Sequence, residues 1–143
     1  MSTSLETLFD LSLARAQLAR DVDHPLSAHG ISLADLAILR ELRRAPEGKL
    51  RRSDLAQSLG ITPSGIARQV APLERIGLVG RESHDRDARL ALVVLTTTGA
   101  QIVDEALVTA EDAADRALAA RWSDTERERL SKLLAQVRLH SRA

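Results

Sequence analysis

The 143-residue chain contains no cysteine and no tyrosine, and it has one phenylalanine, Phe9, and one tryptophan, Trp122. The absence of cysteine excludes disulfide bonds, thiolate zinc sites and thiol-based redox sensing. The longest apolar run, Leu90–Leu95, is far too short to cross a bilayer. The first residues are acidic and carry no apolar signal core, so we expect no secretion signal, no membrane partner and a cytoplasmic location.

Sequence patterns that carry enzyme chemistry are missing as well. There is no glycine-rich phosphate loop, no nucleophile elbow and no recognisable Ser/His/Asp set. The four histidines are dispersed, and the spacing of His24 and His29 does not place them on one helix face. A metal site would therefore need carboxylates from distant segments. We predict no enzyme activity, no metal site and no cofactor.

The chain is instead rich in aliphatic and charged residues, and its positive charge is concentrated in the middle. Its abundant Leu, Ala, Arg and Glu favour helices, so we predict one mainly helical domain. The net charge is zero, but residues 40–89 carry 11 basic and 7 acidic side chains. Residues 1–39 carry 2 and 5, and residues 90–143 carry 7 and 8. A central basic segment indicates where phosphates would be neutralised.

This basic segment has the pattern of a helix-turn-helix. A short helix is predicted over about residues 53–59, and Gly60 ends it. Thr62 suits the N-cap of the next helix, and Pro63 suits its first position. The buried stripe predicted for this second helix is Ile66, Val70 and Leu73. Gly77 then suits a left-handed C-terminal cap.

Two apolar segments after this helix predict a β-hairpin. The expected strands are Leu78–Glu82 and Leu90–Leu95, and the connection between them is polar and charged. Lys49–Arg51 is expected to add a short third strand. The predicted fold class is therefore mainly α with a small β-wing. Such a winged helix-turn-helix lays one helix in the DNA major groove and its hairpin beside it.

Further helices are predicted on both sides of this module. An apolar stripe predicts a helix over residues 4–22, which Pro25 and Gly30 end or kink. Ser32 and Asp35 have the spacing of a capping box at the start of a second helix.

After the wing, Thr96 or Thr97 is expected to cap a long helix that runs to about Ala120. Ser123 begins another capping box. The last helix has more apolar surface than a lone terminal helix needs.

Several short motifs occur in a fixed order. They are Leu55-Ala56 with Leu59-Gly60, Thr62-Pro63-Ser64, Leu73-Glu74 with Gly77-Leu78-Val79, and Asp85-x-Asp87-x-Arg89 followed by Leu95-Thr96 and Gly99. Together with the order of elements, they resemble the MarR family of bacterial transcription regulators over essentially the whole chain. The resemblance implies that residues 1–30 and 97–143 are dimerisation helices and that residues 31–96 are a winged helix-turn-helix DNA-binding lobe.

The resemblance further implies a homodimer that reads a pseudo-palindromic operator in double-stranded DNA. The two recognition helices would lie about one DNA turn apart, ~34 Å. It also implies repression that a small aromatic or anionic effector relieves. The alternative is a winged helix that binds protein without sequence-specific DNA binding, which an exposed apolar recognition face would favour. The predicted face is polar and cationic, which favours DNA.

Residues suited to DNA contact cluster on the helix-turn-helix and the wing. Arg68 can chelate a guanine edge, and Gln69 an adenine edge. Arg86, at the wing tip, is suited to a narrow minor groove. Arg89 either contacts DNA or is held by the acidic residues of the hairpin. The full predicted set is Arg51, Arg52, Ser53, Thr62, Pro63, Ser64, Gly65, Arg68, Gln69, Arg75, Arg86 and Arg89.

Two further expectations concern a helix break and an effector pocket. Pro72 falls inside the recognition helix and is expected to kink it beyond the base-reading turns. An effector pocket is expected among the first, second and fifth helices, although core packing is the alternative for its apolar residues. Its predicted lining is Leu13, Leu36, Arg40 and Ile102. The scarcity of aromatic residues predicts an aliphatic pocket, with ring stacking limited to Phe9 or Trp122.

Overall fold

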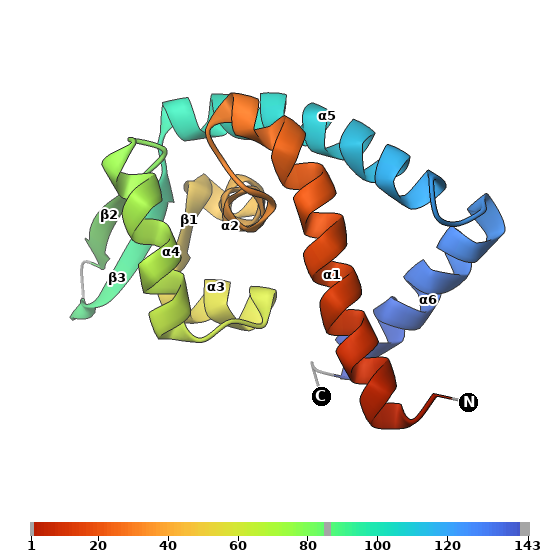
Figure 1. Cartoon of the computed structure of the whole chain (residues 1–143). Helices are drawn as coiled ribbons and strands as arrows, with labels where there is room; N and C mark the ends of the chain where they lie inside the picture. The colour runs from red at the N-terminus through yellow and green to blue at the C-terminus, as the bar shows by residue number, and fades with distance from the viewer. Residues whose placement is uncertain (1, 85–86, 141–143) are drawn as a thin grey trace.

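A frame of long helices carries a small three-stranded sheet in the computed structural model, which describes residues 2–84 and 87–140 (Figure 1). In chain order its elements are α1 (Ser4–Leu26), the 3-10 helix η1 (Ser27–His29), α2 (Leu33–Arg44), the 3-10 helix η2 (Pro46–Gly48), β1 (Lys49–Arg51), α3 (Arg52–Leu59), α4 (Pro63–Arg75), β2 (Val79–His84), β3 (Asp87–Leu95), α5 (Thr97–Ala119) and α6 (Asp124–His140). The helix-turn-helix, the wing and the flanking helices predicted from the sequence are all present.

The strands form one antiparallel sheet in the order β1-β3-β2. Lys49 pairs with Val94, and Val79 pairs with Leu95. Val79 and Val93 are each 2% exposed, because β2 packs against α4 and β3 packs against α2. The wing is therefore attached to the helix-turn-helix through a shared core.

One continuous core joins the lobe to the long helices. Its most fully buried side chains are Leu26, Ile38, Leu39, Leu42, Leu55, Ile66, Leu73 and Val103. Helix α5 contributes small buried residues, including Ala106, Ala110 and Ala113, which let the backbone of α1 approach closely. Since a buried leucine stabilises a fold by roughly 2 kcal/mol, these few large side chains dominate the stability of the lobe.

Local capping signals explain where the helices start. The Ser32 hydroxyl accepts the Asp35 N–H (3.1 Å), and the Asp35 carboxylate accepts the Ser32 N–H (3.0 Å), so the predicted capping box is confirmed. Thr96, rather than Thr97, caps α5. Gly30 and Gly77 have φ of +75° and +80°, the left-handed region that favours glycine after a helix.

Some predicted boundaries differ from the observed ones. Helix α1 runs through Pro25 to Leu26, because a proline in the last turn removes few helix hydrogen bonds. The wing strands extend to His84 and from Asp87, well beyond the apolar residues, because the cross-strand ladder also holds polar residues in strand conformation. Helix α3 begins at Arg52, one residue earlier than predicted.

Helices α1, α5 and α6, called here the helical arms, form an open frame beside the winged-helix lobe of residues 31–96 (Figure 1). Helix α5 runs along both α1 and α2 and then turns into α6. Among the described residues, no helix is long and apolar enough to cross a membrane. The arms reach away from the sheet and leave much of their surface uncovered by the rest of the chain.

Candidate nucleic-acid interface

The turn between α3 and α4 positions the recognition helix α4. Gly60 ends α3 with φ of +66°, and the Ile61 N–H donates to the Ala56 carbonyl (3.0 Å). The Thr62 hydroxyl then accepts the Gly65 N–H at 3.1 Å and caps α4. A Cβ at position 65 would lie 2.7 Å from Cγ2 of Ile61, so glycine keeps this turn tight.

Helix α4 has a fully buried face and an exposed polar face. Ile66, Val70 and Leu73 are 0%, 3% and 1% exposed, as predicted. On the outer side, Thr62, Pro63, Ser64, Arg68 and Arg75 are exposed, while Gly65 and Gln69 are half-buried. Arg68 and Arg75 form no ion pair with any residue that the structure describes. Their guanidinium groups are therefore available to an anionic partner.

A second cationic group lies at the start of α3. Arg51 ends β1 and occupies the N-cap position of α3 without a side-chain capping bond. Arg51 and Ser53 are exposed, and Arg52 is half-buried. Three residues of the predicted DNA-contact set, Arg51, Arg52 and Ser53, thus lie at the start of α3.

The wing is tied to the recognition helix and to β1 by ion pairs. The Nε of Arg81 on β2 donates to the Glu74 carboxylate on α4 at 2.9 Å. On the other face of the sheet, Nζ of Lys49 lies 3.0 Å from the Glu82 carboxylate and reaches across β3. Each pair joins two different elements, so the spacing of residues within one helix or strand does not predict it.

The structure describes the two predicted wing arginines only in part. Arg86 lies outside the described residues, and Arg89 is described only by its backbone in β3. Pro72 is exposed, and α4 continues past it to Arg75 as one element. Pro72 lies in the last two turns, beyond Ser64 and Arg68, as predicted; the bend of the helix remains a prediction.

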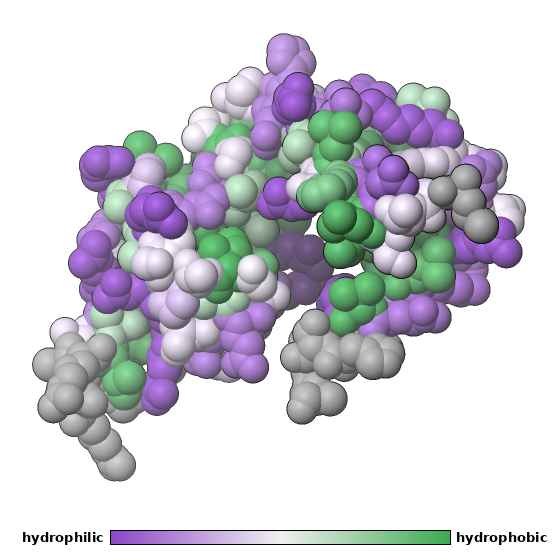
Figure 2. Space-filling view, turned by 60° about the horizontal axis from the view of Figure 1, so that its bottom comes forward, coloured by the Kyte–Doolittle hydropathy of each residue, from purple (hydrophilic) through white to green (hydrophobic). Residues whose placement is uncertain are grey.

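The four predicted effector residues differ in burial. Leu36 is 3% exposed in the core, Ile102 packs against the same core, and Leu13 and Arg40 are exposed. The large cleft of the molecule, about 870 Å³, is lined by none of the four. It lies between α1, the start of α2, the end of α5 and α6, and hydrophobic side chains gather beside the hollow (Figure 2). The assignment of these four residues to an effector remains a prediction.

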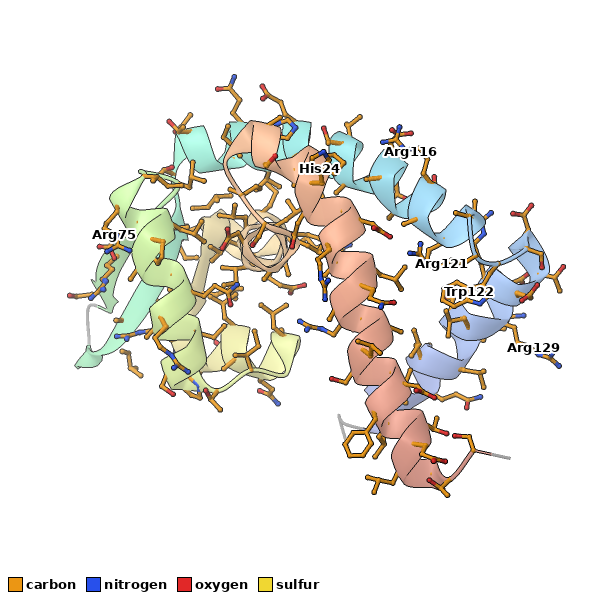
Figure 3. The ribbon with its side chains drawn as sticks, in the orientation of Figure 1. His24, Arg75, Arg116, Arg121, Trp122 and Arg129 are labelled. Atoms are coloured by element: carbon orange, nitrogen blue, oxygen red, sulfur yellow. The ribbon has the colours of Figure 1, made fainter. Side chains whose placement is uncertain are left out.

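The walls of the cleft are mostly aliphatic. Its apolar walls include Leu11, Ala14, Leu18 and Val22 of α1, with Leu130 and Leu134 of α6. Trp122 lies at the corner of α5 and α6, on the side of this cleft (Figure 3). Polar groups are few, with Asp10, Arg15 and Asp23 among them. The cleft residues of α1 recur every three or four positions and so form an apolar stripe along one face of the helix.

Two ion pairs hold the arms to each other and to the lobe. Arg43 of α2 donates through Nε and a terminal nitrogen to the two carboxylate oxygens of Asp104 on α5, at 3.2 and 3.1 Å. These hydrogen bonds lower the pKa of Asp104 and raise that of Arg43. Arg121 lies 3.0 Å from Asp21 and joins the end of α5 to α1.

Comparison with known proteins agrees with this arrangement. A model of the MarR family matches residues 29–90. An uncharacterized HTH-type transcriptional regulator of Mycobacterium leprae is 36% identical over 97 residues, which cover 68% of this chain and 66% of that protein. The HTH-type transcriptional repressor YetL of Bacillus subtilis is 27% identical over 92% of this chain and 76% of its own length.

Solved structures show the same fold. A MarR family transcriptional regulator of Streptomyces coelicolor, crystallised in complex with DNA, superposes with a TM-score of 0.80 at 27% identity and covers 96% of this chain and 88% of that one. The chain therefore belongs to the MarR family, whose members are DNA-binding transcriptional regulators and not enzymes.

Proposed function

We propose that the protein is a transcriptional repressor that binds a pseudo-palindromic operator as a homodimer, with α4 in the major groove. The observation that carries the proposal is the outer face of α4, where Ser64, Arg68 and Arg75 are exposed and the arginines have no partner in the described chain. A helix with one face fixed in a core and a free cationic face suits base and phosphate contacts. An apolar outer face would instead favour a protein partner.

The comparisons support both parts of this proposal. The similar regulator of Streptomyces coelicolor was solved with DNA bound, which favours DNA as the partner of α4 here. The similar protein of Bacillus subtilis is named a repressor, which favours repression. The M. leprae relative is matched over about two thirds of its length, so its name supports regulation in general terms only.

The homodimer of the proposal follows from the apolar surface of the arms. Leu5, Leu8 and Phe9 of α1 are 60%, 63% and 65% exposed, and Leu133 and Val137 of α6 are 54% and 66% exposed. Contiguous apolar surface of this kind usually marks an interface. A second copy presents the same surface, so a two-fold contact covers both at once.

A small-molecule effector completes the proposal. The part of the cleft between α1, α2 and α5 touches both the arms and the lobe, so a ligand there would change how they meet. Its volume of about 870 Å³ and its aliphatic walls suit an apolar molecule with few polar groups. Trp122 is the only tryptophan and tyrosine is absent, so the intrinsic fluorescence reports on this cleft.

The test is fluorescence anisotropy with the intergenic DNA upstream of the gene for this protein, at two salt concentrations. Arg68→Ala is expected to weaken binding by roughly 10- to 100-fold, because a bidentate guanine contact contributes about 1–3 kcal/mol. Arg129→Ala is the matched control, since Arg129 is an exposed arginine that projects outward from α6 (Figure 3). Wild-type binding should also fall steeply as salt rises.

The contrary result would be equal, weak binding of wild type and Arg68→Ala to this DNA and to random duplexes. Selection from a random DNA pool then decides whether the operator lies elsewhere. If no sequence is enriched, the winged helix serves a protein partner instead.

A further inference from the structure

Two backbone hydrogen bonds hold the turn between α4 and β2 against the end of α4. The Leu78 N–H donates to the Leu73 carbonyl at 3.0 Å, and the Gly77 N–H donates to the Glu74 carbonyl at 3.1 Å. Gly77 has φ of +80°, which a residue with a Cβ rarely adopts. The end of α4 and the start of β2 therefore share one fixed conformation.

Thr96 connects this turn to α5. Its hydroxyl lies 2.7 Å from the Gly77 carbonyl oxygen and 3.0 Å from the Leu78 carbonyl oxygen, and it accepts the Gly99 N–H at 2.9 Å. The Thr96 N–H donates to the Leu78 carbonyl at 3.1 Å. A hydroxyl has one proton to donate and two lone pairs, so one side chain can bond to the turn and cap α5 together.

Gly99 brings the two backbones into direct contact. It is buried, and a Cβ at this position would overlap the Leu78 carbonyl oxygen and lie 2.8 Å from Cδ1 of Leu95. Because the first obstacle is backbone, no change of side-chain rotamer relieves it. Any larger residue must push α5 away from the turn. One helical turn further on, Val103 is fully buried and anchors α5 in the core.

We propose that Thr96 and Gly99 are positioning residues, which form a joint between the recognition helix and α5 and thereby set the half-site spacing that the dimer reads. The inference rests on the proposed function, since it requires two recognition helices on one operator. Helix α5 belongs to the arms, so its position fixes where the second copy lies. A recognition helix held against α5 is then held at one distance from its counterpart.

A change in the distance between the two DNA half-sites would require the lobe to move relative to α5. One added base pair moves a half-site by about 3.4 Å and rotates it by roughly 35° about the DNA axis. A lobe tightly bonded to α5 cannot follow this movement without losing contacts. A loosened joint can follow it, at the cost of affinity for the preferred spacing.

The experiment measures spacing preference directly. The probe is the duplex that wild type selects from a random pool, rebuilt with its half-sites one base pair closer and one base pair further apart. Thr96→Val removes the hydroxyl at nearly constant shape, and Thr96→Ser retains it. Thr98→Val is the matched control on an exposed position, and Gly80→Ala is the control for Gly99→Ala, because a Cβ at Gly80 meets no atom within 4 Å.

Wild type is expected to prefer its selected spacing by about tenfold or more, since lost contacts of about 1.4 kcal/mol correspond to a factor of ten. Thr96→Val and Gly99→Ala should lower this ratio at least threefold, while Thr96→Ser and both controls keep it. Thermal unfolding and sedimentation show that the variants compared are folded dimers. If Gly99→Ala does not fold, the pair Thr96→Val and Thr96→Ser decides.

An unchanged spacing ratio in a folded, dimeric Thr96→Val overturns the joint while the proposed function stands. A wild type that binds one half-site as tightly as two overturns the proposed function, and the role of the joint with it.

Discussion

The winged-helix lobe and the helical arms use apolar residues in opposite ways. Eleven large hydrophobic side chains are exposed among the described residues, and nine of them belong to α1, α5 or α6. Among the described residues of the lobe, Ile61 and Ile76 are the only large hydrophobic side chains that are exposed. The lobe thus completes its core within one chain, whereas the arms need a further surface to cover theirs.

Charged residues of both regions form ion pairs, but the outer face of α4 has two arginines without one among the described residues. On the arms, Arg116 pairs with Asp112, Arg121 with Asp21 and Lys132 with Glu128. On the outer face of α4, Arg68 and Arg75 remain without an ion pair in the described chain. In the proposed function, the apolar surface of the arms meets the second copy, and the cationic outer face of α4 meets DNA.

The largest expected effect breaks this comparison at the arms. Leu133→Glu places a carboxylate on the apolar face of α6 and should weaken dimerisation at least 100-fold, because a buried unpaired charge costs several kcal/mol. Ile76→Glu is the same change at nearly the same exposure, 57% against 54%, but in the lobe. Sedimentation equilibrium should show a monomer for the first variant and a dimer for the second.

A dimer in both variants would show that the apolar face of α6 is not part of the dimer contact. Loss of the dimer in both would contradict the division between lobe and arms. Circular dichroism separates dissociation from unfolding, because Leu133 is exposed in the single chain and its replacement leaves no cavity.

The elements of the lobe were predictable because their signals are local. A cap, a proline at a first helical position or a glycine with positive φ is set by neighbours within four residues, as Ser32, Thr62 and Gly77 illustrate. The polar face of α4 was predictable for the same reason, since its residues follow from helical spacing. Their contacts with DNA remain a prediction.

The arms and the joint were less predictable because they depend on how distant segments meet. The cleft forms where α1, the start of α2, α5 and α6 converge, so its lining residues could not be assigned from one helix at a time. The sequence identifies Thr96 as a candidate helix cap and Gly99 as part of a family motif. Only the fold shows that Gly99 faces the Leu78 carbonyl.

A smaller effect sharpens the comparison of charges. Glu74→Gln removes an acidic group from the lobe, and electrostatics alone predicts tighter DNA binding. We expect binding about two- to fivefold weaker, because the exposed Arg81–Glu74 pair, though of modest energy, aligns β2 with α4. Asp112→Asn removes the same charge from an ion pair on the arms and is the matched control.

Anisotropy at two salt concentrations decides the sign. Tighter binding by Glu74→Gln would mean that Glu74 merely lowers the positive potential of the interface. The exchange Glu74→Arg with Arg81→Glu restores the pair at constant net charge, and the positioning role predicts that affinity recovers in this double variant.

The smallest expected effect concerns the ion pair that crosses from the lobe to the arms. Hydrogen bonds from Arg43 lower the pKa of Asp104, so the pair contributes stability above the ordinary aspartate pKa of about 3.9 and loses it as pH falls through the lower, folded-state value. Asp104→Asn should lower the unfolding midpoint by no more than about 2 °C near pH 7, because both side chains are half exposed. The difference from wild type should shrink below pH 4. Glu111→Gln, an exposed change on the same helix, should show no such convergence. A difference that stays constant down to pH 2.5 would mean that the two regions are held together by packing along α2 and α5, with no measurable contribution from this ion pair.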